Sequence, residues 1–173
     1  MKKIIALLLL ITMIVSGYVL AGPYMAVNRL EKALQNRDSA MLAQYVDFPV
    51  LRENLKEQIN ESLLKELKEM EDDDPFAAFG IAFLSLVIDG LVDMLLTPTG
   101  IGSLALGILP DLVKGEVEEV PLEQAKFFAN ARYTIDGFSQ VSLWMENGLG
   151  DVFRFIFSRY GLTWKLSNVI IPL

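Results

Sequence analysis

Alternating side chains close the chain, in VFRFIFSRYGLTWKLSNVIIP (residues 152–172). Bulky apolar residues alternate with polar ones on both sides of Tyr160-Gly161, which is the pattern of two β-strands joined by a tight turn. Successive side chains of a strand point to opposite faces, so one face of this hairpin is apolar and the other is polar. The apolar face must be buried, and the rest of the chain therefore has to supply a covering layer.

A tight turn at Tyr160-Gly161 sets the predicted pairing of the hairpin. The apolar face then carries the pairs Phe157 with Trp164, Phe155 with Leu166 and Phe153 with Asn168, with Arg159 facing Leu162 next to the turn. The reverse face carries Ser158 with Thr163, Ile156 with Lys165 and Arg154 with Ser167. A slip of one residue would mix the two faces, so the alternation specifies the register.

The preceding strand is predicted in SQVSLWMEN (residues 139–147), and Asn147-Gly148 marks its turn into the hairpin. Its alternation adds three residues to the apolar face: Val141, Leu143 and Met145. Trp144 then lies on the polar face near Arg154, where the indole ring and the guanidinium can stack.

Helical spacing dominates the chain before the sheet, over residues 23–107. Pro23 suits the first turn of a helix that follows or continues the N-terminal segment, and Asp38 is the predicted N-cap of a short second helix. Asp47-Phe48-Pro49 ends that helix, because the residue before a proline avoids the helical region. The apolar positions of the three helices are Tyr24, Val27, Leu30 and Leu34; Met41, Leu42, Tyr45 and Val46; and Leu51, Leu55, Ile59, Leu63 and Leu67.

Residues 76–96, FAAFGIAFLSLVIDGLVDMLL, are apolar on nearly all sides and predict a central core helix, after which Thr97-Pro98 starts another. One line at i,i+4 spacing is polar: Ser85, Asp89, Asp93 and Thr97. Carboxylates one turn apart can act as acid and base, but the same pattern marks the exposed edge of a buried helix, which we favour. The acidic run EMEDDDP before this helix lacks the glycine and ligand spacing of a calcium loop, so we interpret it as a solvated turn.

The first residues predict a membrane segment. Met1-Lys2-Lys3 precedes IIALLLLITMIVSGYVLA, an uncharged run of 18 residues (4–21), as in membrane anchors and secretory signals. Its length favours an uncleaved anchor that crosses the inner membrane once and places the following domain in the periplasm. Cleavage after Val19-Leu20-Ala21 would instead release the protein into the periplasm. We therefore expect an anchor or signal segment in residues 1–22 and a single extracytoplasmic domain in residues 23–173.

Together these elements predict an α+β fold. A membrane anchor comes first, and a helical layer of about five helices then packs on one face of a C-terminal antiparallel sheet of three to four strands. The other face of that sheet is predicted to be open to solvent.

Charge and missing residue types exclude several functions. Without Lys2 and Lys3 the 15 lysines and arginines become 13, against 22 aspartates and glutamates, a formal charge of −9. A domain this acidic repels phosphate backbones, so we predict no nucleic-acid partner. The sequence has no Cys and no His, which excludes disulfides, Ser-His-Asp and Cys-His catalysis and His-ligated zinc. We predict neither a metal nor a cofactor.

Three stretches of the chain are distinctive as a group: ALQNRDSAMLAQYVDFPVLRENLKEQI, DPFAAFGIAFLSLVIDGLVDMLLTPTG and FRFIFSRYGLTWKLSNVIIP. They resemble the bacterial domain-of-unknown-function family 2939, and the resemblance implies a membrane-anchored protein without a catalytic motif. More loosely, the helix before Arg37-Asp38, the run LAQYVD and the late WKL step are similar to nuclear-transport-factor-2-like cone folds. That similarity implies a fold of a kind that often encloses a pocket.

Two functions are compatible with this sequence. The first is a non-enzymatic envelope module, tethered by its N-terminal helix, that binds an unknown protein or an apolar small molecule. The alternative is a small acid–base enzyme of the isomerase or dehydratase type with a cone-shaped pocket. Its candidate residues are Asp47, Asp89 and Asp93, with Tyr133 or Tyr160 as the partner. A buried carboxylate in a pocket would favour the enzyme, whereas a filled core and an exposed apolar patch would favour the module.

Overall fold

The computed structural model describes residues 2–69, 87–108, 125–128 and 130–172, except for the side chains at positions 2–3, 6–9, 11–12, 14–16, 18–20, 63–64 and 66–69. Its helices are α1 (Lys2–Gln35), α2 (Ser39–Tyr45), α3 (Phe48–Glu69), the helical residues Val87–Leu95, and α5 (Pro98–Ala105). Its strands are β1 (Arg132–Ile135), β2 (Gln140–Glu146), β3 (Val152–Tyr160) and β4 (Thr163–Ile170).

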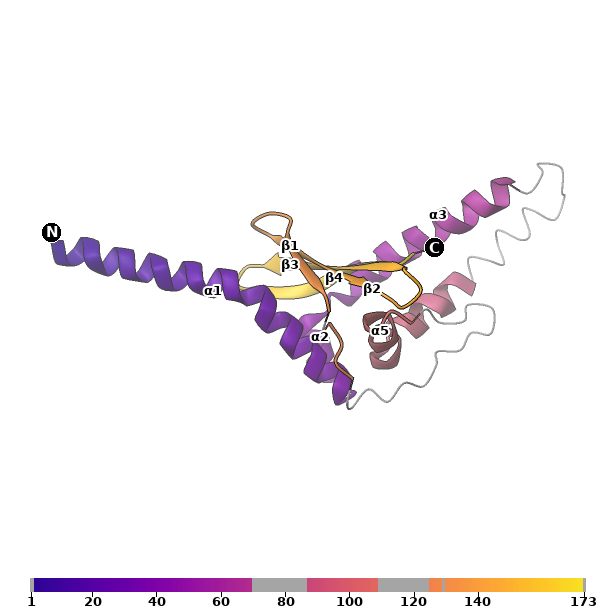
Figure 1. Ribbon diagram of the computed structural model, residues 1–173, viewed down its shortest axis with the longest axis horizontal. Coiled ribbons are helices and arrows are strands. Elements are labelled where there is room, and N and C mark those ends of the chain that lie inside the picture. The colour runs from indigo at the N-terminus through magenta and orange to yellow at the C-terminus, as the bar shows by residue number, and fades with distance from the viewer. Residues whose placement is uncertain (1, 70–86, 109–124, 129, 173) are drawn as a thin grey trace.

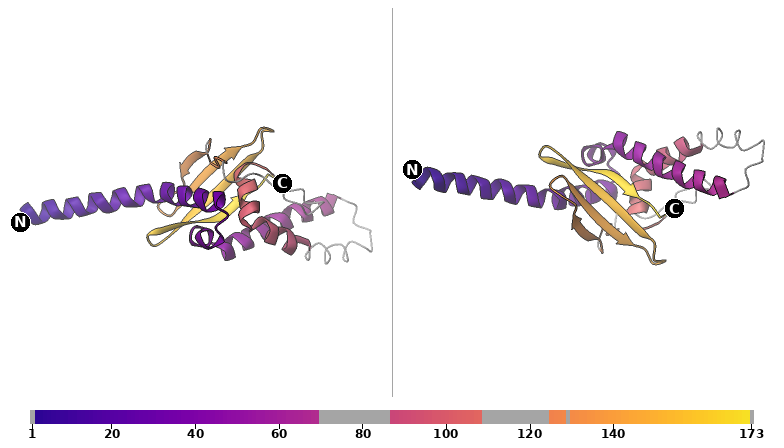
Figure 2. Two further views of the ribbon diagram at one scale, coloured as in Figure 1. Left: turned by 90° about the horizontal axis from the view of Figure 1, so that it is seen from below. Right: turned by 90° about the horizontal axis from the view of Figure 1, so that it is seen from above.

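The described part of the chain forms two layers (Figure 1). All neighbouring strands are antiparallel, in the order β1-β2-β3-β4. The two opposite views in Figure 2 show the helices in front of the sheet from one side and the strands in front from the other. The predicted α+β class, with helices on one face of a C-terminal antiparallel sheet, is confirmed.

Local sequence signals define where several helices begin. The Asp38 side chain accepts a hydrogen bond from the backbone N–H of Met41 at 2.9 Å and caps α2 as predicted. The Thr97 hydroxyl caps α5 in the same way, with Pro98 in the first turn. Pro23 lies inside α1, which runs without a break from Lys2 to Gln35. The helix after the uncharged run therefore continues it, which was one of the two predicted arrangements.

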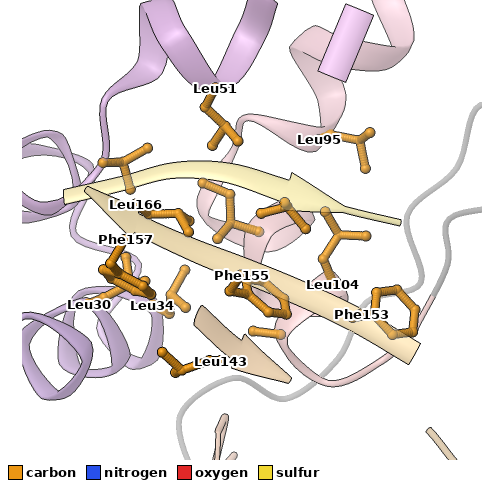
Figure 3. Packing of buried hydrophobic residues seen from close by; sticks show 14 of the residues in the cluster. Leu30, Leu34, Leu51, Leu95, Leu104, Leu143, Phe153, Phe155, Phe157 and Leu166 are labelled. Atoms are coloured by element: carbon orange, nitrogen blue, oxygen red, sulfur yellow. The ribbon is translucent and has the colours of Figure 1, made fainter. Parts of the chain in front are cut away.

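The core lies between the sheet and the helical layer (Figure 3). Three phenylalanines on one face of β3, Phe153, Phe155 and Phe157, are completely buried. They face leucines of α1, α3, α5 and the Val87–Leu95 helix; those labelled in Figure 3 are Leu30, Leu34, Leu51, Leu95 and Leu104. The predicted α3 stripe is confirmed for Leu51, Leu55 and Ile59, which are buried, whereas the side chains of Leu63 and Leu67 lie outside the described residues.

The predicted register of the last hairpin is wrong by one position at the turn. Tyr160 pairs with Thr163, so the two turn residues are Gly161 and Leu162 rather than Tyr160 and Gly161. Gly161 has a φ of +64°, whereas Leu162 does not have a positive φ. A positive φ at only the first of the two turn positions is the signature of a type II′ turn. Moving the turn by one position moves the pairing by two residues, so Phe157 now pairs with Leu166 instead of Trp164, and Trp164 and Leu166 both keep their predicted face.

A β-bulge changes the pattern again farther along β4. The register shifts between Ile156 and Phe157, whose partners are Asn168 and Leu166, so Ser167 is the extra residue. The extra residue moves Val169 onto the apolar face, where the prediction had placed Asn168. The Ser167 side chain is buried, and its hydroxyl lies 2.7 Å from the Ser158 hydroxyl.

Gly161→Val is expected to lower the free energy of unfolding by about 1–2 kcal/mol or more, because a β-branched residue is strained in the left-handed region. Gly148→Val is the matched control, since Gly148 is also an exposed turn glycine but does not have a positive φ. Denaturant unfolding of the two full-length variants compares them. Equal losses would contradict the assigned turn.

Tyr24, which the sequence placed on the apolar face of its helix, does not lie in the core. Tyr24 is 48% exposed and its ring stacks on Tyr133 of β1, with ring centroids 4.7 Å apart. The buried face of α1 passes instead through Ala26, Val27 and Leu30. One turn earlier, Gly22 lies directly against the indole of Trp164, leaving no room for a side chain there. Together these contacts hold the second half of α1 against β1 and β4.

Among the residues whose side chains the structure describes, no single helix is long and apolar enough to cross a membrane. Val87–Leu95 and Pro98–Ala105 would suffice as a pair by length and composition alone, although they are bent by 77°.

Candidate functional site

The two edges of the sheet differ in how their backbone groups are used. The outer edge of β4 is covered by the start and first turns of α3. The backbone C=O of Leu166 accepts a hydrogen bond from the Asp47 N–H at 2.9 Å, and that of Ser167 accepts one from the Asn54 side chain at 2.9 Å. The Gln58 side chain donates to the Val169 C=O at 2.9 Å and accepts from the Ile171 N–H at 3.3 Å. These four backbone groups of the edge are therefore satisfied within the chain.

The edge formed by β1 is open in the part of the chain that the structure describes. Among the described strands β1 pairs only with β2, and all four of its residues are exposed. The Asp136 N–H donates to the Gln140 C=O at 3.0 Å, and bonded pairs alternate with non-bonded pairs along an antiparallel ladder. It follows that the N–H and C=O groups of Tyr133 and Ile135 point away from β2, toward the open edge. This edge can accept another strand.

A shallow hollow of about 410 Å³ lies at the open edge. Arg132, Tyr133 and Thr134 of β1 line it together with Trp144 of β2. The guanidinium of Arg154 lies 4.7 Å from the centre of the Trp144 ring, so the predicted stacking is confirmed. Arg154 also donates to the Asp136 carboxylate at 3.0 Å, and the two contacts hold it against the outer face of the sheet. The hollow combines an aromatic wall with polar and cationic groups.

A second hollow, of about 390 Å³, lies between the end of α5 and the β2–β3 turn. Asn147 organises its polar groups. The Asn147 side chain donates to the Gly107 C=O at 3.1 Å and to the Asp151 carboxylate at 2.9 Å, and it accepts from the Leu149 and Asp151 N–H groups. These polar groups are engaged in forming the turn itself, so the hollow offers few free donors or acceptors.

The two aspartates of the predicted polar stripe are exposed and paired with α3. Asp89 forms an ion pair with Lys56, and Asp93 forms one with Arg52. More than half of each aspartate side chain is exposed. Thr97 caps α5, and Ser85 lies outside the described residues, as does most of the acidic run before it. The stripe is thus the wet edge of a core helix, the interpretation that the sequence favoured.

Asp89→Asn combined with Asp93→Asn is expected to lower the free energy of unfolding by less than about 1 kcal/mol, because exposed ion pairs are weak and screened by salt. Urea unfolding at low and high salt measures the cost, which should shrink as salt rises. A loss of several kcal/mol would instead indicate a buried carboxylate pair and would support the enzyme alternative.

The third candidate carboxylate, Asp47, lies at the start of α3. Within the described residues no contact joins it to Asp89 or Asp93. Its side chain accepts a hydrogen bond from the Val50 N–H at 3.4 Å, as a helix N-cap does. Partial burial raises the pKa of the Tyr160 hydroxyl above its ordinary value of 10.0, and the neighbouring Asp47 carboxylate raises it further. Tyr160 therefore keeps its proton at neutral pH.

Tyr133 lies in β1 at the open edge and lines the hollow there. Burial against α1 raises the pKa of its hydroxyl, and Tyr24 and Glu31 raise it further. Sequence reasoning missed the Tyr24–Tyr133 stack because the two residues are far apart in the chain, and only the docking of α1 on β1 joins them. In the described residues no group of three Asp, Glu, His or Cys side chains could hold a metal ion.

The family model described as a protein of unknown function (DUF2939) matches residues 12–104, more than half of the 173-residue chain. The chain belongs to this family. The DUF2939 match includes most of α1, all of α2 and α3, and α5 except its last residue, whereas the whole sheet lies after it. No curated protein and no solved structure matches the chain, so the similarity to cone folds stays a prediction.

Proposed function

We propose that this DUF2939 protein is a membrane-tethered, non-enzymatic interaction module of the bacterial envelope. In this proposal residues 4–21 of α1 cross the inner membrane, and the α+β domain lies in the periplasm. The domain binds an extended segment of a partner protein along the open edge of β1.

The contrast between the two sheet edges carries the proposal. The β4 edge is covered by Asn54, Gln58 and the backbone of Asp47, whereas β1 directs the backbone groups of Tyr133 and Ile135 away from β2. Ile135 is 66% exposed and the adjacent hollow has an aromatic wall. An added strand would gain main-chain hydrogen bonds from the edge and side-chain contacts from the hollow, which is how β-strand addition recognises peptides.

The described core also supports binding rather than acid–base chemistry. The buried polar residues in the described ranges are serines: Ser103, Ser142 and Ser167. None of the described carboxylates is buried, and the three candidates do not share a pocket. The alternative of a small carboxylate enzyme, or of a pocket for an apolar ligand inside the core, therefore has weaker support.

The partner-binding part of the proposal is tested by photo-crosslinking in native membranes. A photoreactive residue at Thr134 of the full chain should capture a defined polypeptide, and the same residue at Leu149, at the far end of the sheet, should not. Ile135→Pro removes an outward N–H without removing a bond to β2, so it should abolish capture. Ile135→Val keeps the N–H and should preserve it. Capture that survives Ile135→Pro would contradict binding through the β1 backbone.

The tether is tested separately. The full chain should remain in the membrane pellet after alkaline carbonate extraction, and its N-terminal sequence should still include Lys2 and Lys3. A mature chain that begins at Gly22 in the soluble periplasmic fraction would show that the segment is a cleaved signal.

A further inference from the structure

Two exposed apolar side chains mark the tips of the β1–β2 and β3–β4 turns. Phe138 is 95% exposed and Leu162 is 67% exposed, although each lies in a turn where a polar residue would serve the fold equally well. The tips read DGFS (136–139) and YGLT (160–163), and they contain a single charged residue, Asp136. The Arg154 guanidinium lies 3.0 Å from the Asp136 carboxylate and neutralises that charge. Both tips are thus apolar and without net charge.

Both tips lie at the same end of the sheet. The Arg159 N–H donates to the Ser139 C=O at 2.8 Å, which joins the end of β3 to the β1–β2 turn. At this end Gly22 of α1 touches Trp164 and Tyr24 stacks on Tyr133. In both views of Figure 2 the ribbon of α1 crosses the outline of this end of the sheet, and its N-terminal half extends beyond the domain. The tips are therefore level with the part of α1 around residues 22–24.

The membrane surface is expected at the level of residues 22–24 of α1. The uncharged run 4–21 has a helical length of about 27 Å, at 1.5 Å per residue, which is close to the thickness of the hydrocarbon core. If this run spans the bilayer, the headgroup region begins at about Gly22. Tyrosines favour this region, and Tyr24, Tyr133 and Tyr160 all lie at this end of the domain.

We propose that Phe138 and Leu162 insert into the interfacial region of the outer leaflet of the inner membrane and seat the domain on the bilayer. The inference rests on the proposed tether. α1 holds both tips at the surface, so shallow burial of two apolar side chains needs no further attraction. The acidic domain gains nothing from anionic lipids, and the contact is accordingly an apolar one. The seating fixes the orientation of the domain, and with it the direction of the open β1 edge.

The chain has no cysteine, so single-cysteine variants of the full chain can each carry one environment-sensitive fluorophore. Phe138→Cys and Leu162→Cys probe the tips. Leu149→Cys is the matched control, because Leu149 is 89% exposed at a turn at the opposite end of the sheet. Met13→Cys probes the middle of the uncharged run. Each variant is reconstituted in phosphatidylcholine vesicles, and quenching is measured with aqueous iodide and with lipids that carry a shallow nitroxide.

At the tips, iodide quenching should be at least about fivefold weaker than at Leu149, and the shallow nitroxide should quench strongly, as expected for interfacial burial. Tips as accessible to iodide as Leu149 would overturn the inference. Tips protected from iodide but not quenched by the nitroxide would also overturn it, since a protein contact would then cover them. A label at Met13 that iodide quenches freely would refute the tether itself, whereas a lipid-protected Met13 with accessible tips would refute only the seating.

Discussion

Phe155→Ala is expected to lower the free energy of unfolding by about 3–5 kcal/mol, a large part of the stability of a domain of this size. Phe155 is completely buried at the centre of β3 and meets the ring of Phe128 edge-to-face, with ring centroids 5.2 Å apart. Truncation leaves a cavity between the sheet and the helices that the close-packed surroundings cannot refill.

Urea unfolding of the full chain in detergent measures this loss. Lys165→Ala is the control, because Lys165 lies on the opposite face of the neighbouring strand and is partly exposed. Its cost should be below about 0.5 kcal/mol. Similar losses for both variants would mean that both faces of the sheet are covered, and the two-layer arrangement would be contradicted.

Trp164→Ala is expected to cost a similar amount, about 3–5 kcal/mol, and also to loosen α1. The Trp164 side chain is 5% exposed, and its indole lies against the backbone of α1 at Gly22. Because no side chain extends from Gly22, a smaller residue at position 164 would leave the helix without a partner there. Hydrogen exchange at residues 22–34 of α1 should therefore accelerate, in addition to the loss measured by urea unfolding.

The chain supplies its own control in its second tryptophan. Trp144 lies on the outer face under Arg154, where a cation–π contact contributes about 0.5–1 kcal/mol. Trp144→Ala should therefore cost much less and should leave exchange in α1 unchanged. If the two tryptophan variants had equal effects on α1, Trp164 would not be the contact that holds the helix.

The catalytic candidates show where sequence reasoning reached its limit. The i,i+4 spacing of Asp89 and Asp93 correctly indicated a shared helix edge. Whether that edge faced a pocket or water depended on α3, which places Lys56 and Arg52 opposite the two carboxylates. The open edge of β1 was not predicted at all, because a strand lies at an edge when another strand pairs with it on one side only. Periodicity within one strand carries no such information.

The sequence by itself determined what depends on neighbouring residues. Alternation gave the apolar face of β3, and side-chain chemistry gave the caps at Asp38 and Thr97, because a strand face and a helix cap are each formed within a few residues. Only the tertiary structure decided the bulge at Ser167, the covering of the β4 edge by Gln58, and the packing of α1 against the end of the sheet that carries two hairpin tips. Each of these joins segments that are distant in the chain, so the packing of the helical layer on the sheet selects them rather than any local preference.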